Sequence, residues 1–345
     1  MTLRRAGIAL LALAGLKALV VLAGYGVLQR WLDTPLAMGA APLEIEIPRG
    51  QPLAVTARQL AERGVLDHPR WLQLYARATG ADARIRAGEY AVPAGTTPRS
   101  LLALLESGAV IQHSVTIVEG WTFRELRQAL EAEPYLDHTL AGQDEAAVMV
   151  ALGEPGMPAE GLFFPDTYLF GKGTTDLEIL RLARNRMRRE LEAAWAARAA
   201  DLPVHSAYEA LILASIVEKE TALASERPRI AGVFTERLRI GMRLQTDPTV
   251  IYGLGTDFDG NLRRADLERD GPYNTYTRAG LPPTPIALPG AEALRAAVNP
   301  DERGELYFVA TGLADGSHEF SRTLKEHQAA VSRYLVRYRK RNAGR

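Results

Sequence analysis

The 345-residue sequence contains no cysteine, and its 41 basic and 41 acidic side chains cancel. The lack of cysteine excludes disulfides, thiolate metal sites and cysteine nucleophiles. A net charge of zero gives no electrostatic reason to expect nucleic acid as a partner. The six histidines form no His-x-x-x-His pair and do not cluster with acids at metal-binding spacing. We therefore expect no metal site and no cofactor.

The sequence also lacks the Gly-x-Ser-x-Gly elbow of serine hydrolases. Its hydrophobic fraction of 47% and charged fraction of 24% are typical of globular proteins, and its length allows two domains. The catalytic chemistry that remains is that of carboxylates. Acidic residues in apolar surroundings are therefore the first candidates for a catalytic group.

The amino terminus begins with an apolar run, Ala6 to Leu28. At 1.5 Å per residue, this run could cross a bilayer core of about 30 Å. Because two arginines precede it, we expect a cytoplasmic tail at 1–5, a single transmembrane anchor at 6–32 and the rest of the chain outside. Lys17 interrupts the run and weakens this prediction. Trp31 is predicted to lie at the outer membrane interface.

A cleaved signal peptide, ending near the small residues 37–40, is the alternative to a retained anchor. Arg30 and Asp33 separate the apolar run from those residues, and the run is longer than a usual signal core. The sequence therefore favours the anchor.

A weak repeat follows a short Pro/Ala/Gly linker at 34–42. Gly50, Gly95 and Gly120 each follow a short β-like run and precede an amphipathic stretch with matching apolar spacing. This pattern predicts a strand, a tight turn and a helix, used three times.

One helix is predicted to carry a carboxylate at the end of an apolar run. Ser206 and Glu209 have capping-box spacing, and the eight residues that follow carry no charge, so the helix should be buried nearly all round. Glu218 is its first charged group and lies on the same stripe as Leu211. Apolar walls would raise the pKa of this carboxyl and make it a proton donor. The alternative is a helix-end charge paired with Lys219 or a nearby arginine.

Two irregular segments downstream carry polar groups. Gln245 and Asp247 lie on a loop braced by Pro248, just before Tyr252. The stretch 273–290 contains Asn274, Tyr276 and four prolines, which reduce the entropy lost when a loop is ordered. Further on, the sequence predicts a hairpin of residues 305–310 and 317–321.

Four motifs together resemble the YceG-like family of endolytic murein transglycosylases. They are ASIVEKET at 214–221, RIGMRLQTDPTVIYG at 239–253, YNTY at 273–276 and GLPP at 280–283. The similarity spans about residues 43–340. Thr284 and Leu288 depart from the family pattern, so no substrate contact is assigned to Leu288.

The resemblance implies an α+β protein with an N-terminal transmembrane helix. A small LysM-like strand-turn-helix domain is expected at 43–115, and a mixed α/β catalytic domain at 116–340. The family's substrate is the peptidoglycan glycan strand. The catalytic domain would lie in the periplasm, at the outer side of the inner membrane, with peptidoglycan synthases as candidate partners.

The resemblance also implies a mechanism with one carboxylate. Glu218 would protonate the β-1,4 bond between N-acetylmuramic acid and N-acetylglucosamine, then deprotonate the muramoyl 6-hydroxyl so that a 1,6-anhydro ring closes. Such endolytic cleavage would terminate the elongation of nascent strands. The predicted sugar-binding residues are Gln245, Asp247, Tyr252, Asn274 and Tyr276. Glu220 lies about 200° around the helix from Glu218 and is expected to be structural.

Two other classes of function remain open. A muramidase would need a second carboxylate, for which Asp247, Asp166 and Glu160 are candidates. A membrane-anchored peptidoglycan-binding protein would need no catalytic carboxylate.

Overall fold

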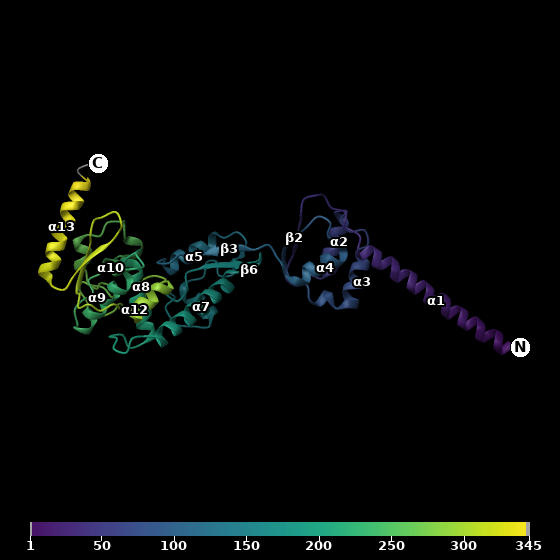
Figure 1. Cartoon of the computed structure of the whole chain (residues 1–345), viewed down its shortest axis with the longest axis horizontal. Coiled ribbons are helices and arrows are strands. Elements are labelled where there is room, and N and C mark those ends of the chain that lie inside the picture. Colours follow the sequence, from purple (N-terminus) through teal and green to yellow (C-terminus); the bar gives the residue numbers. More distant parts are fainter. Residues whose placement is uncertain (1, 343–345) are drawn as a thin grey trace. The chain divides into compact units, whose positions relative to one another are not determined.

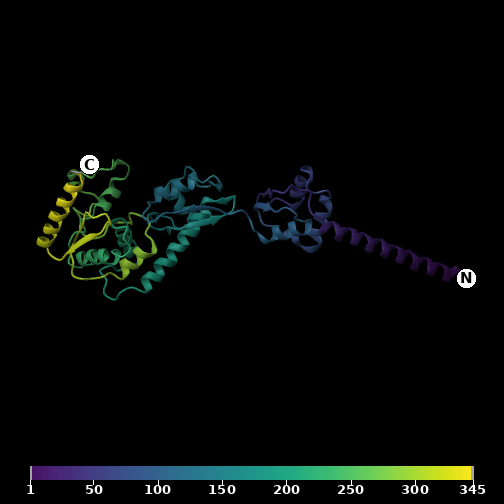
Figure 2. The same cartoon turned by 45° about the horizontal axis from the view of Figure 1, so that its top comes forward.

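The computed structural model describes residues 2–342, and these form two compact units. The first unit runs to His113 and includes the later segment Leu169–Thr174, and the second contains Ser114–Tyr168 and the chain from Thr175 onward. Figures 1 and 2 show the elements of each unit from two directions. Met1 and residues 343–345, the last three of the basic C-terminal stretch, lie outside the described part.

The first helix, α1 (Thr2–Leu32), leaves its apolar side chains exposed along much of its length. The segment Leu13–Leu32 is long and apolar enough to cross a membrane, with a mean hydropathy of 1.3, and none of its residues before Trp31 is buried. The prediction for Trp31 is wrong, however. Its ring is buried in the core of the first unit, and its Nε1 donates to Asp67 at 2.7 Å, because the helix enters the folded unit before it ends.

The first unit packs short helices against a two-stranded antiparallel sheet. Strand β1 (Leu43–Ile47) pairs with β2 (Gly88–Val92) so that Ile45 lies opposite Tyr90. The helices are α2 (Leu53–Glu62), α3 (Pro69–Thr79), the 3₁₀ turn η1 (Ala81–Ala83) and α4 (Pro98–Ser107). Alternate strand residues and the apolar helix faces form one core, centred on the fully buried Tyr90.

The three predicted strand–turn–helix repeats are present. Gly50, Gly95 and Gly120 have φ angles of 77°, 79° and 78°, which side chains other than glycine rarely adopt. The first two repeats are β1–α2 and β2–α4. The third is β3 (His113–Thr116) followed by α5 (Phe123–Ala132), and it leads into the second unit.

The second unit is mostly helical, with short strands between the helices. Its further helices are α6 (Glu145–Leu152), α7 (Asp176–Ala196), α8 (Ala207–Glu220), α9 (Arg227–Arg239), α10 (Asp247–Leu254), the 3₁₀ turn η2 (Gly255–Asp257), α11 (Arg264–Glu268), α12 (Ala291–Val298) and α13 (Leu324–Asn342). The described strands form two-stranded sheets: β1–β2, β3 with β5 (Thr167–Phe170), β4 (Leu136–Asp137) with β6 (Thr174–Thr175), and β7 (Tyr307–Ala310) with β8 (His318–Ser321). The chain is therefore a mixed helix-and-strand protein.

Helix α8 is the centre of the second unit. It packs against α7, α9, α10 and α12, as Figures 1 and 2 show, and every residue from Ala210 to Glu218 is buried. The predicted all-round burial is thus confirmed. Ser206 accepts a hydrogen bond from the Glu209 N–H at the start of the helix, but the Glu209 side chain binds the His205 N–H instead of completing a capping box.

The proline-rich segment is held along α8. Ser215 Oγ accepts from the Ile286 N–H at 3.0 Å and donates to the Ile212 carbonyl at 2.7 Å. Ile286, Ala287 and Leu288 are almost fully buried. Leu288 therefore serves packing, in line with the absence of a predicted substrate contact.

The predicted C-terminal hairpin is confirmed, with Tyr307 opposite Ser321, and α13 packs against both of its strands. His318 begins β8, and its backbone N–H and Nδ1 lie 2.9 Å and 2.7 Å from the two oxygens of Glu226. The hairpin is thereby tied to the residue that precedes α9.

Candidate active site

Two carboxylates lie two residues apart at the end of α8, in different surroundings. Glu218 and Glu220 are separated by about 200° around the helix. Both line a cavity of about 480 Å³ formed with the turn at Glu119–Trp121. Glu220, unlike Glu218, also lines another cavity, of about 420 Å³, between α8, the 244–247 loop and the C-terminal hairpin.

Both oxygens of Glu218 already accept hydrogen bonds. Arg227 donates to Oε1 at 2.8 Å, and the Gly290 N–H donates to Oε2 at 2.9 Å at the start of α12. Burial raises the pKa of Glu218, while these two donors and the helix terminus favour its charged form. The alternative prediction for Glu218 was an ion pair with a nearby arginine, and the structure contains this ion pair.

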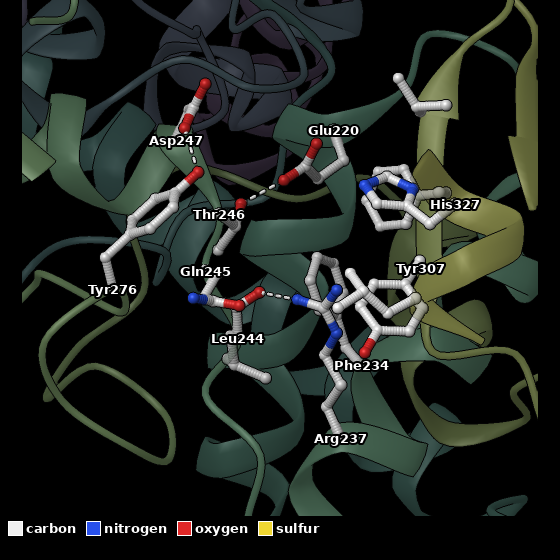
Figure 3. A pocket seen from close by; sticks show the side chains of 13 residues that line it. Glu220, Phe234, Arg237, Leu244, Gln245, Thr246, Asp247, Tyr276, Tyr307 and His327 are labelled. Carbon is white, nitrogen blue, oxygen red and sulfur yellow. Dashed lines mark hydrogen bonds between the residues drawn. The ribbon is translucent and has the colours of Figure 1, made fainter. Parts of the chain in front are cut away.

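Glu220 has a different set of contacts. The Thr246 hydroxyl donates to its Oε1, and no residue in the described range 2–342 donates to its Oε2. Figure 3 shows this bond and the neighbouring one between Tyr276 and Asp247. Burial raises the pKa of Glu220, and the charge of Asp247 adds to the rise, whereas the Thr246 bond acts against it. A carboxyl with a raised pKa and a free oxygen is suited to donate a proton.

The loop that carries Thr246 is held in an unusual backbone conformation. Gln245 has a φ of 50°, the one positive value among the described non-glycine residues. Its N–H donates to the Thr275 carbonyl at 3.1 Å, and the Thr246 N–H donates to Thr275 Oγ1 at 3.1 Å. Strained backbone of this kind persists where the surroundings fix it, often at functional sites.

Arg237, from α9, holds the same loop through hydrogen bonds to backbone carbonyls. Its guanidinium donates to the Leu244 carbonyl at 2.5 Å and to the Leu306 carbonyl at 2.7 Å. It therefore connects α9, the loop and the start of the hairpin. Tyr307 from β7 and His327 from α13 stack with their ring centroids 5.2 Å apart and form another wall. The cavity is thus a polar site with aromatic walls.

Three of the predicted sugar-binding residues line the cavity beside Glu220. They are Gln245, Asp247 and Tyr276. The Tyr276 hydroxyl donates to Asp247 Oδ1 at 2.5 Å. Burial and this bond raise the pKa of Tyr276, so the phenol stays neutral and remains a donor.

The other two predicted residues lie elsewhere. Asn274 is buried, and its side-chain amide donates to the carbonyls of Asp266, Leu267 and Arg269. Tyr252 lies edge-on to Tyr273 and hydrogen-bonds to Glu160. Both residues hold loops together and do not line the cavity.

The candidate second carboxylates are also separated. Burial raises the pKa of Glu160 to about 7, and this carboxyl accepts from the Phe123 N–H at 3.0 Å. Asp166 is paired with Arg186. Of the three candidates, only Asp247 shares a cavity with Glu220.

Comparison with known proteins identifies the family. The model of the YceG-like family matches residues 45–333. The chain belongs to the YceG-like family. The resemblance carried by the four sequence motifs is thereby confirmed.

Relatives with assigned activity are similar to this YceG-like chain over most of its length. An endolytic murein transglycosylase of Bacillus subtilis (strain 168) is 32% identical over 310 residues, which cover 85% of each protein. One from Streptococcus pneumoniae serotype 2 (strain D39 / NCTC 7466) is 27% identical, over 92% of this chain and 63% of the relative.

A solved structure shares the fold. The 2.6 Å crystal structure of a YceG-like protein, lmo1499 from Listeria monocytogenes, matches 84% of this chain and 99% of its own. The TM-score is 0.52 and the sequence identity is 28%.

Sequence reasoning missed the position of Glu220. The helical spacing correctly separated Glu220 from Glu218, but the face that Glu220 occupies borders the cavity with Gln245, Asp247 and Tyr276. One signal was available. An arginine nine residues after Glu218, at the start of the next helix, is a natural partner for it.

Proposed function

We propose that this YceG-like protein is an endolytic peptidoglycan transglycosylase, and that Glu220 is its catalytic acid and base. One observation carries the assignment of Glu220: a carboxyl with a raised pKa and an unbound oxygen lines a polar cavity with Gln245, Asp247 and Tyr276. The names of the relatives support the reaction class. Glu218, the residue predicted from the sequence, is the competing candidate.

The proposed reaction uses one carboxyl group twice. Protonated Glu220 donates its proton to the oxygen of the β-1,4 bond between N-acetylmuramic acid and N-acetylglucosamine, and the bond from C1 to that oxygen breaks. The ionised Glu220 then takes the proton of the muramoyl 6-hydroxyl while O6 bonds to C1. The products are a free 4-hydroxyl and a 1,6-anhydro ring, and no water is consumed.

The neighbouring residues have supporting roles in this proposal. Thr246 orients the carboxyl through its hydroxyl. Asp247 disfavours a second negative charge nearby and so helps to keep Glu220 protonated before cleavage. Tyr276 holds Asp247 in place. The exposed side chain of Gln245 lines the cavity and would bind a sugar substituent.

Asp247 also favours one alternative. A muramidase needs a second carboxylate near the acid, as nucleophile or as base for water, and Asp247 shares the cavity of Glu220. Its bond to Tyr276 occupies one oxygen only. Hydrolysis would give reducing ends in place of anhydro ends, so the products distinguish the two reactions.

We also propose that α1 anchors the protein in the inner membrane, with its amino terminus in the cytoplasm. The exposed apolar span supports the anchor. The same proposal includes peptidoglycan synthases as partners, termination of strand elongation as the result of cleavage, and a LysM-like role for the first unit. Cleavage next to the membrane would act on nascent strands.

The test is the mass of the products. The full-length protein in detergent is incubated with purified, uncrosslinked glycan strands, and the fragments are analysed by mass spectrometry. Internal fragments ending in 1,6-anhydro-N-acetylmuramic acid support the proposal. Fragments with reducing ends would instead indicate a muramidase. Intact strands that co-purify with the protein would indicate a binding protein.

A further inference from the structure

The two cavities at the end of α8 have Glu220 in common. The first contains the loop with Thr246, and the second lies against the turn between β3 and α5. A carboxyl that acts on a bond inside a polymer needs room for the chain on both sides of that bond. The second cavity therefore has the right position to hold sugars beyond the first.

The lining of the second cavity suits a neutral, polar ring. The half-buried indole of Trp121 and the exposed Val118 provide apolar surface. Arg227 also lines the cavity, with its side chain 9% exposed, and its Nε–H has no acceptor among the described residues. Glu119 is about half-exposed, and its carboxylate contacts Arg227 at 3.5 Å.

These groups argue against a free anion as the ligand. Arg227 lies between the carboxylates of Glu218 and Glu119, so its charge is already compensated. Lys219 also lines the cavity and donates to the Gly120 carbonyl at 3.1 Å, and Glu125 accepts from Thr122 at the start of α5. The other groups offer an unused N–H donor, a carboxylate acceptor and an aromatic ring. An N-acetylated sugar matches this set, because it carries an acetamido carbonyl, hydroxyl donors and an apolar C–H face.

The turn that carries Trp121 is fixed before any ligand arrives. The Gly120 N–H donates to the Leu288 carbonyl at 2.9 Å, and the Leu288 N–H donates to the Trp121 carbonyl at 2.7 Å. Leu288 is fully buried beside α8. At Gly290, a Cβ atom would meet the Glu119 carboxylate, so a larger residue there would force Glu119 to move. A preformed site loses less entropy on binding.

We propose that the second cavity is a glycan subsite on the opposite side of the scissile bond from the first. Trp121 stacks on a sugar ring, the Arg227 Nε–H donates to its acetamido carbonyl, and Glu119 accepts from a hydroxyl. This inference rests on the proposed function. It adds Trp121 and Glu119 as residues that determine how the enzyme holds a long strand.

The experiment measures binding without cleavage. Full-length Glu220→Gln in detergent is titrated by calorimetry with N-acetylglucosamine–N-acetylmuramic acid oligomers of two lengths, an octasaccharide and a disaccharide. We expect Trp121→Ala, added to Glu220→Gln, to weaken octasaccharide binding about tenfold. Trp121→Phe, which keeps an aromatic ring, should weaken it less than threefold. Disaccharide binding in the first cavity should be unchanged.

Two outcomes would overturn the subsite. Equal octasaccharide affinity with and without Trp121 is one, and equal losses for both oligomers is the other.

Glu119→Ala is a second variant in case Trp121→Ala unfolds. Because the Glu119 side chain is half-exposed, its removal should have little effect on packing. We expect a threefold loss of affinity for the octasaccharide alone. The wild type is also tested for cleavage of glycan strands. If it cleaves them but loss of Trp121 leaves octasaccharide binding unchanged, only the subsite proposal fails. If the wild type neither cleaves nor binds strands, both proposals fail together.

Discussion

Glu218 and Glu220 are the same residue type on the same helical turn, and yet they differ in almost every property that matters for catalysis. Glu218 is the more buried of the two, and both of its oxygens are occupied by an arginine and a helix N-terminus. Glu220 has one bound oxygen, an acidic neighbour and a place in both cavities.

The comparison shows that burial alone does not define a catalytic acid. Burial raises the pKa of both groups. The hydrogen bonds from Arg227 and Gly290 occupy both oxygens of Glu218 and join α8 to α9 and α12, so a proton on either oxygen would displace a donor. In the part of the chain that the structure describes, no cation is in direct contact with Glu220. A proton on its free oxygen would displace no donor.

The largest expected effect is on turnover, and it tests the comparison directly. We expect Glu220→Gln to lower kcat by about a thousandfold or more, because a group that serves as both acid and base contributes at least 10²–10⁴. Glu218→Gln should retain more than about a tenth of the wild-type kcat, since Gln still accepts from the Gly290 N–H. Release of anhydro ends measures both.

Matched substitutions make this test decisive. The two variants change one heavy atom each, two residues apart, and unfolding midpoints well above the assay temperature would show that neither loss reflects misfolding. The assignment is reversed if Glu218→Gln is inactive while Glu220→Gln turns over normally. In that case the residue predicted from the sequence is the acid.

The next effect is on stability. Arg227→Gln leaves the buried Glu218 without its cation, and breaking a buried pair from one side costs about 3–5 kcal/mol. The double variant Glu218→Gln/Arg227→Gln removes both charges and should recover most of that loss. Urea unfolding of the four proteins completes a double-mutant cycle. If both Arg227 variants are equally destabilised, packing of the arginine and not its charge holds the helices together.

Local patterns in the sequence were enough to predict much of this fold. The three glycine turns, the buried helix α8 and the C-terminal hairpin follow from glycines after β-like runs, an apolar run and the Asp315-Gly316 dipeptide, and all are present. Trp31 was misplaced because membrane and core environments both favour an aromatic residue at the end of an apolar helix. Composition cannot distinguish these two environments.

The site was only partly predictable, for a related reason. Polar residues in irregular segments indicated Gln245, Asp247 and Tyr276, which do line the cavity, but the same reasoning also indicated Asn274, whose amide is used up by three carbonyls. The choice between Glu218 and Glu220 depends on partners 9 to 72 residues away. Such long-range contacts are set by tertiary packing and not by helical spacing.

The smallest expected effect refines the role of Glu220. The Thr246 hydroxyl donates to the carboxylate, which favours the charged form and lowers the pKa of Glu220. Thr246→Val removes this donor, so the pKa should rise further. Because cleavage needs protonated Glu220 and is lost as the pH rises through its pKa, the alkaline limb of the profile of kcat/KM against pH should move to higher pH. The value at neutral pH should change by no more than about tenfold. Thr246→Ser keeps the hydroxyl and should retain the wild-type profile.

A profile that moves equally in Thr246→Ser, or in neither variant, would mean that this limb reports another group. The buried Glu160, with its pKa of about 7, would be the next to test.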